Sequence, residues 1–250
     1  MLFIGHGSPM NAIEENLYTR GWKALAAALP RPSAIAVLSA HWFVPGTRVN
    51  NDPHPRTVHD MYGFPKARYE LSYAVAGATA LADEARGLRG NGAVVDNGWG
   101  LDHGAWSVLH VMYPQADLPV FQVSIDSEAL PQAHYELGRR LAPLRRKSVL
   151  LLASGNIVHN LQLVDFGAAG GLPWAVDFDG WVKERVLSRQ HADLLEYGRA
   201  GKSAALAVPT PDHYQPLLYL LGASRPEEAV AAHLESCVYG SLSMTCYRFG

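Results

Sequence analysis

The sequence predicts an α/β fold in one domain, residues 1–250, with a central, mostly parallel or mixed sheet flanked by helices. Two observations carry this prediction. Short apolar runs that end in glycine or a small polar residue recur along the chain, as expected of strands covered on both faces. Segments with a helical spacing of apolar residues lie between these runs, and no linker or repeat divides the chain.

The elements follow in order along the chain. The expected strands are Leu2 to Gly5, Ala34 to Ser39, Pro119 to Ser124 and Val149 to Ser154. The expected helices are Leu17 to Leu29, Ala78 to Leu88, Trp106 to Met112, Ala133 to Leu144 and Phe178 to Leu195, with another beginning near Gln215. The stretch from Ser236 to Phe249 alternates partly and predicts a closing strand or hairpin. In such folds, ligands bind beyond the carboxyl ends of the strands.

Composition excludes several classes of protein. Hydrophobic residues make up 48% of the chain and charged residues 18%, which is typical of a folded globular protein. The formal net charge of -2 gives no basic stripe, so neither nucleic acid nor an anionic membrane is an expected partner. No apolar run approaches the roughly 18 residues of a spanning helix, and we expect a cytoplasmic protein. Cys237 and Cys246, the two cysteines, are expected to be buried thiols.

Histidines are the candidates for chemistry, because four of the eleven lie where a predicted strand or helix meets a loop. His6, His41 and His159 each follow an apolar strand, and His213 precedes the helix near Gln215. The carboxyl ends of parallel strands share one edge of a sheet, so these imidazoles are placed to converge. Neutral imidazole suits zinc and iron. The pattern therefore predicts one mononuclear metal site.

Two acidic residues accompany histidines at helix starts. Asp102 precedes His103 and is placed to cap the helix that follows. Asp212 precedes His213, where capping the next helix is an alternative to binding metal. The remaining histidines are expected to be structural or on the surface: His54, His110, His134, His191 and His233.

The connection from Asn50 to Tyr69 is long for a compact domain, which indicates a functional role such as an active-site wall. Within it, His59 and Asp60 are placed to reach a substrate. Three common signatures are missing from the sequence: the Gly-x-Ser-x-Gly elbow, the Walker loop and Gly-x-Gly-x-x-Gly. Serine hydrolase, phosphate-binding and dinucleotide-binding functions therefore lack support.

Taken together, these motifs resemble the class III extradiol ring-cleavage dioxygenases, and most closely their DOPA 4,5-dioxygenase-like branch. The resemblance runs nearly end to end. It is carried by six ordered stretches: Gly5-His6-Gly7-Ser8-Pro9-Met10, Ser39-Ala40-His41-Trp42, His59-Asp60 with Tyr62-Gly63-Phe64-Pro65, Leu101-Asp102-His103-Gly104-Ala105-Trp106, Ser154-Gly155-Asn156-Ile157-Val158-His159-Asn160 and Pro209-Thr210-Pro211-Asp212-His213-Tyr214.

The resemblance implies one divalent metal per chain, Fe(II) in the active form or Zn(II) as isolated, held by His6, His41 and His213. It places His159 either in the metal shell or against the substrate, and His103 as an acid and base. The wider group binds iron through two histidines and a carboxylate. Here His213 stands where that carboxylate is expected, which leaves zinc a credible occupant.

The activity implied is cleavage of the ring of a catechol such as L-DOPA by O₂, in the 4,5-extradiol manner, by a monomer or small homo-oligomer. Trp42, His59, Tyr62 and Phe64 are expected either to wall the pocket, with His59 and Tyr62 contacting substrate, or to be ordinary packing residues. Two alternatives stay open on sequence grounds. One is a zinc hydrolase that uses the same histidines to activate water, and the other is a non-catalytic metal-binding protein of this fold.

Overall fold

A mixed sheet of eight strands forms the centre of the computed structural model, which describes residues 1–89 and 92–250. The strands lie in the order β4-β3-β5-β2-β6-β1-β10-β7. Their bounds are β1 (Leu2–Gly5), β2 (Ala34–Val44), β3 (Arg48–Asn50), β4 (Val94–Val95), β5 (Val120–Asp126), β6 (Val149–Gly155), β7 (Val230–His233) and β10 (Cys246–Phe249). A separate pair, β8 (Cys237–Val238) and β9 (Leu242–Ser243), forms a small hairpin.

The four strands predicted from the sequence are the parallel core of this sheet. β1 and β2 each pair in parallel with β6, and β2 also pairs in parallel with β5. The flanking strands β10 and β3 run antiparallel to β1 and β5, so the sheet is mixed. The predicted C-terminal strand is confirmed in β10. Strands β3, β4 and β7 were not predicted; each has two to four residues and is too short for a periodic signal.

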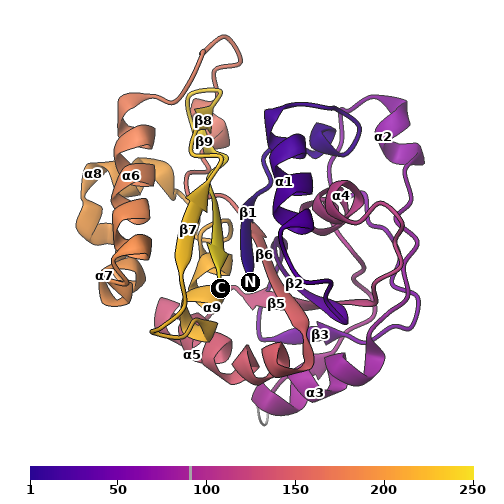
Figure 1. The fold of residues 1–250 in the computed structure, drawn as a ribbon. Coiled ribbons are helices and arrows are strands. Elements are labelled where there is room, and N and C mark those ends of the chain that lie inside the picture. Colours follow the sequence, from indigo (N-terminus) through magenta and orange to yellow (C-terminus); the bar gives the residue numbers. More distant parts are fainter. Residues whose placement is uncertain (90–91) are drawn as a thin grey trace.

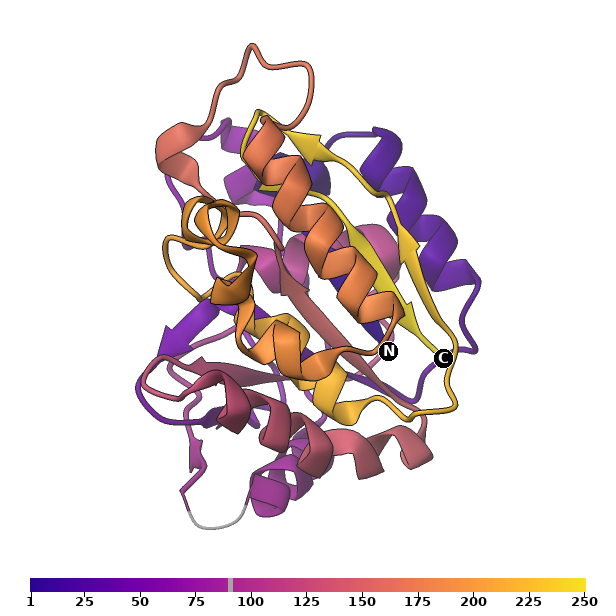
Figure 2. The same ribbon diagram turned by 90° about the vertical axis from the view of Figure 1, so that its left-hand side faces the viewer.

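Helices cover both faces of the sheet, as the alternating pattern predicts (Figures 1 and 2). The α-helices are α1 (Leu17–Ala27), α2 (Lys66–Glu70), α3 (Thr79–Arg89), α4 (His103–Met112), α5 (Pro131–Leu141), α6 (Pro173–Leu187), α7 (His191–Leu195), α8 (Lys202–Ala207) and α9 (Gln215–Ala223). Short 3-10 turns are η1 (Pro9–Ala12), η2 (Ala142–Lys147), η3 (Leu161–Leu163) and η4 (Tyr197–Ala200).

Strand alternation divides the core into two clusters. Leu2 and Ile4 of β1 pack with α1 and α4, whereas Phe3 between them packs with the helices of the opposite face. β2 and β6 alternate in the same way, because successive side chains of a strand point to opposite faces. Figure 2 shows α6 in front of the sheet and α1 behind it. Burial on both faces explains why these strands read as continuous apolar runs.

Two predicted helices need correction. The segment predicted as one helix from Phe178 to Leu195 is α6 followed by α7, and the break includes Arg189 with φ +58°. The helix predicted from Trp106 begins three residues earlier, at His103, because the Asp102 side chain caps it by accepting the Ala105 N–H at 3.1 Å. This cap places His103 in the first turn of α4.

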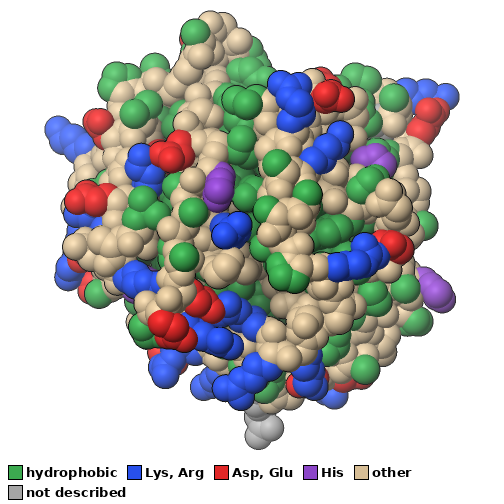
Figure 3. All heavy atoms as spheres, in the orientation of Figure 1, with side chains coloured by type: hydrophobic (Ala, Val, Ile, Leu, Met, Phe, Trp, Pro, Cys, Tyr) green, Lys and Arg blue, Asp and Glu red, His purple; other side chains and the backbone are tan. Residues whose placement is uncertain are grey.

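Within residues 1–89 and 92–250, no helix is both long and apolar enough to cross a membrane. The face drawn in Figure 3 carries side chains of both signs, and Lys and Arg gather beside Asp and Glu along its lower part. This mixture agrees with the formal net charge of -2.

Glycines allow α5 and α9 to pack backbone against backbone. A Cβ at Gly222 would lie 1.9 Å from the Tyr135 carbonyl oxygen, and one at Gly138 would lie 2.0 Å from the Tyr219 carbonyl oxygen. No side-chain rotation relieves a clash with backbone, so a methyl group at either position must separate the helices.

We predict that Gly222→Ala lowers the free energy of unfolding by at least about 1–3 kcal/mol, the usual cost of overpacking a core. Gly180→Ala, on α6 with nothing within 4 Å of its Cβ position, is the matched control and should be neutral or slightly stabilising. Urea unfolding of both variants measures the difference. Equal stability would show that the α5–α9 contact is looser than described.

Candidate metal centre

Two of the candidate histidines come from neighbouring parts of the sheet edge. His6 directly follows β1, and Gly7 after it has φ +57°, a conformation that favours glycine. His41 lies within β2, which continues to Val44, and not beyond its end as expected. The pairing of β2 with β5 shifts register between Leu38 and Phe43. Such an irregularity re-aims side chains, and here it lies at the position of His41.

His159 and His213 reach the same edge from the C-terminal half of the chain. His159 follows β6 and forms an isolated bridge with Leu242 of β9. His213 is held behind the end of β6, where the Asn156 N–H donates to its carbonyl oxygen at 3.0 Å. A Cβ at Gly155 would lie 2.2 Å from that oxygen, so only glycine allows this approach.

Three imidazoles lie at nearly equal separations. The ring centroids are 5.0 Å apart for His6 and His41, 5.3 Å for His6 and His213, and 4.9 Å for His41 and His213. Imidazoles that share one ion have centroids about 5 Å apart, because each nitrogen lies about 2.1 Å from the ion and each ring centre about 1.1 Å behind its nitrogen. The spacing of these rings therefore fits one ion.

The other two rings lie differently. His103 is 3.8 Å from His41 between centroids, and His159 stacks on His213 at 3.4 Å with ring planes 5° apart. Ligand atoms within 4.8 Å of one another form two groups, His6 with His41 and His103, and His159 with Asp212 and His213. The two groups share no residue, and the first contains His103 where the ring spacing above selects His213. The ring separations near 5 Å favour His6, His41 and His213 as the three ligands of one ion.

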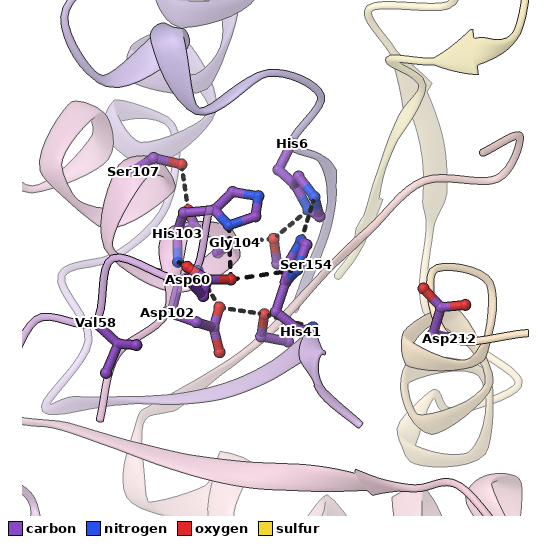
Figure 4. Close-up of polar contacts among 12 residues, drawn as sticks. His6, His41, Val58, Asp60, Asp102, His103, Gly104, Ser107, Ser154 and Asp212 are labelled. Atoms are coloured by element: carbon purple, nitrogen blue, oxygen red, sulfur yellow. Dashed lines mark hydrogen bonds and ion pairs between the residues drawn. The ribbon is translucent and has the colours of Figure 1, made fainter. Parts of the chain in front are cut away.

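Hydrogen bonds behind the rings decide where the His6 proton lies. The Ser154 hydroxyl donates to the Gly104 carbonyl oxygen at 2.6 Å, so its oxygen accepts from Nδ1 of His6 at 3.0 Å (Figure 4). Nε2 of His6 is then a bare lone pair, and it faces Nε2 of His41 at 3.1 Å. A cation between the two nitrogens would be bound by both of them. Without a cation, Nε2 of His41 must carry a proton and donate it to Nε2 of His6.

His213 offers the third nitrogen. Its Nδ1 donates to the Asp212 carboxylate, and no side chain caps α9 within the described residues, so the capping alternative for Asp212 is wrong. Nε2 of His213 is buried and has no hydrogen-bond partner among the described residues, and the residue is 5% exposed. An unpaired buried nitrogen costs free energy that a metal ion would remove. The donor set therefore fits a divalent metal.

Electrostatics keep these rings ready to bind a cation. Burial lowers the pKa of His6 and His41 well below the usual 6.5, and neighbouring histidines lower it further. Burial raises the pKa of the Asp212 carboxyl, but hydrogen bonds from His213 and Thr210 outweigh burial and leave that pKa below its ordinary value. Neutral imidazoles backed by an ionised carboxylate are what metal ligation requires.

Asp60 backs His103 in the same manner. Its carboxylate accepts from Nδ1 of His103 at 2.8 Å and from the His103 backbone N–H at 2.9 Å, and it lies 3.4 Å from Nδ1 of His41. The sequence offered Asp60 only as part of a motif beside His59. Its role as a partner of two histidines depends on contacts 43 and 19 residues apart, which local patterns do not reveal.

The histidines form the floor of a cavity of about 850 Å³, a size typical of sites for small molecules. One wall is polar and comes from the N-terminal segment, including Ser8, Asn11 and Asn16. The lining residues from the C-terminal half are largely apolar and aromatic. This apolar wall consists of Leu161, Val164, Phe166, Val238, Tyr239, Leu242 and Met244.

The predicted loop wall is present in part. Met61 and Phe64 line the cavity, but neither His59 nor Tyr62 is among its lining residues. Tyr62 is 86% exposed, and the His59 ring packs near the rings of Trp106 and Tyr69. Gly63 has φ +85° and turns the chain between Tyr62 and Phe64, which accounts for their opposite directions. Trp42 is buried in the interior.

The other histidines lie away from this floor. His233 belongs to β7 and is half-buried. His134 on α5 has its Nδ1 3.0 Å from the Tyr219 hydroxyl, and burial lowers its pKa to about 4. Both cysteines are free and buried, as predicted.

Comparison with known proteins places the chain in a class. Residues 3–250 match the family described as the catalytic LigB subunit of aromatic ring-opening dioxygenase. The chain therefore belongs to this family, and it is a metal-dependent ring-cleavage dioxygenase of the extradiol class that acts on a small aromatic molecule and O₂.

Individual relatives are similar over their whole length. A protein of Escherichia coli (strain K12) named 4,5-DOPA dioxygenase extradiol is 46% identical over 256 residues, which cover 100% of this chain and 94% of that protein. A protein of Beta vulgaris with the same name is 34% identical, covering 99% and 95%. A crystal structure of an uncharacterized protein from Escherichia coli K12 matches with a TM-score of 0.86 at 42% identity, covering 100% and 98%.

We predict that Asp212→Asn weakens metal binding by roughly 10–100-fold, as loss of a partner behind a metal-bound histidine usually does. Competition with a chromophoric chelator measures this affinity. Asp165→Asn is the control, because its carboxylate accepts the Gly167 N–H on an exposed loop. An unchanged metal affinity in Asp212→Asn would show that His213 is not a metal ligand.

Proposed function

We propose that this protein cleaves the ring of L-DOPA, or of a catechol of similar size, between carbons 4 and 5 with O₂, using Fe(II) held by His6, His41 and His213. One observation carries the proposal. Three imidazoles with ring centroids 4.9–5.3 Å apart line a cavity large enough for such a molecule, and Ser154, Asp60 and Asp212 lie beside their second nitrogens. Relatives named for 4,5-DOPA dioxygenase support the substrate.

When bound, the ion supplies a place where catechol oxygens and O₂ meet and exchange electrons. The protein must leave positions for them beside its own ligands, and a set of three histidines does so. Zinc fits the same nitrogens, and its presence in a purified sample is compatible with this proposal.

His103 is positioned to move protons. A catechol gives up hydroxyl protons as its oxygens bind a cation, and a group within the cavity must accept one of them. His103 lines the cavity, and Asp60 holds its Nδ1, so Nε2 is the nitrogen that accepts. The same ring returns the proton when the ring opens, so it acts as base and then acid.

His159 is proposed to contact the substrate and not to complete the metal shell. Its ring lies parallel to His213 at 3.4 Å, closer than two ligands of one ion would lie. Burial lowers its pKa to about 3, and the neighbouring His213 contributes. A neutral ring at this position offers the catechol a hydrogen-bond partner.

The apolar wall orients the aromatic ring and excludes water. Phe166 and Tyr239, whose rings are 5.2 Å apart, both line the cavity. A catechol enters with its hydroxyls toward the histidines and its side chain toward the opening, because the metal held on the floor binds two adjacent hydroxyls.

The decisive test is O₂ uptake by protein reconstituted anaerobically with Fe(II) and then given L-DOPA and a panel of other catechols. We expect one O₂ consumed per catechol and a yellow ring-opened product. His103→Ala should retain its iron and lose turnover by at least about 10²-fold, the usual contribution of a general base.

Three results would contradict the proposal. Inertness toward every catechol would show that the protein does not cleave catechols. Anaerobic turnover with zinc would indicate a hydrolase. Loss of iron from His103→Ala would show that His103 is a ligand and has been assigned the wrong task.

A further inference from the structure

Asp60 makes an unusual set of contacts with a single neighbour. Oδ1 accepts the backbone N–H of His103 at 2.9 Å, and Oδ2 accepts Nδ1 of the same residue at 2.8 Å. Oδ2 also lies 3.4 Å from Nδ1 of His41. One carboxylate in the loop before α2 thus meets the first residue of α4 twice and a proposed metal ligand once.

An ionised carboxylate can only accept hydrogen bonds, so it dictates where the protons of its partners lie. Burial raises the pKa of Asp60, but the hydrogen bonds from His103 outweigh burial and leave the pKa below its ordinary value. Asp60 is therefore the acceptor in both hydrogen bonds with His103, and the ring proton of His103 lies on Nδ1. Figure 4 shows the other nitrogen of that ring turned toward His6.

We propose that Asp60 is the positioning residue of the reaction: it fixes His103 as the Nδ1–H tautomer, so that Nε2 faces the cavity as a proton acceptor. The same carboxylate lies 3.4 Å from Nδ1 of His41, where its charge favours a proton on that nitrogen and leaves Nε2 of His41 free. This inference rests on the proposed function of His103, and it assigns the tautomer on which that function depends.

A second buried carboxylate shows that the arrangement at Asp60 is specific. Asp102 accepts from Ser39, Trp99, Gln122 and the Ala105 N–H, and none of its bonds reaches an imidazole. Asp102 caps α4 and secures its surroundings. Both oxygens of Asp60 accept hydrogen bonds from His103. A residue that only anchored the loop would not need a hydrogen bond to the His103 ring.

The isosteric variant Asp60→Asn separates these roles. An amide has one acceptor oxygen, and the His103 backbone N–H is always a donor, so the amide oxygen remains with the backbone. The amide NH₂ then faces Nδ1 of His103 and donates to it. The ring proton must move to Nε2, where it blocks proton uptake from the substrate.

The experiment compares zinc-loaded wild type and Asp60→Asn by ¹⁵N NMR of labelled imidazoles, with His103→Gln used to assign the His103 signals. We expect Nδ1 protonated in the wild type and Nε2 protonated in the variant. With Fe(II), Asp60→Asn should lower kcat by about 10²-fold or more, with metal content retained and KM changed far less. Asp52→Asn is the matched control, since it accepts the His54 N–H within the same connection, and it should change neither readout.

An unchanged tautomer in Asp60→Asn would overturn the inference, and so would loss of turnover that simply follows loss of metal. If the variant does not fold, the wild-type spectrum decides alone, because a His103 ring protonated at Nε2 contradicts the assignment. If wild type proves inert toward catechols while the tautomer reverses as expected, the proposed function fails and the tautomer assignment to Asp60 stands.

Discussion

Everything at this site depends on keeping the inward-facing nitrogens of several buried imidazoles free of protons. A buried polar atom without a partner is costly, and two lone pairs 3.1 Å apart repel each other. The protein keeps these nitrogens free of protons by holding each ring proton on the other nitrogen. Ser154, Asp60 and Asp212 each accept a hydrogen bond from Nδ1 of one histidine. A cation then completes the cluster from the front.

The sheet makes such crowding possible. β1, β6 and β2 are adjacent and parallel, so their carboxyl ends deliver His6, His159 and the irregular end of β2 to one edge. Close backbone approach supplies the rest, because Gly155 allows the segment before α9 to bring His213 against β6. The core on both faces of these strands is what holds the edge rigid enough to fix ring separations near 5 Å.

Local pattern explains which features the sequence predicts. The parallel core strands have continuous apolar runs, and His6 and His159 follow them directly, so the sheet edge and its metal-binding character are predictable. The role of Asp60 is not predictable, because its neighbours His41 and His103 are brought together only in the folded chain. The short strands β3 and β4 have no periodicity to detect, and the direction of Tyr62 depends on the turn at Gly63.

The central claim is that His6, His41 and His213 hold one ion through Nε2, with His103 and His159 beside it. A crystal structure of the Fe(II)-loaded protein with anomalous scattering recorded at the iron edge tests this most directly. The account predicts one strong peak within about 2.0–2.3 Å of those three Nε2 atoms, near the usual metal–imidazole distance. A peak bound to His103, or one placed between His159 and Asp212, would contradict it.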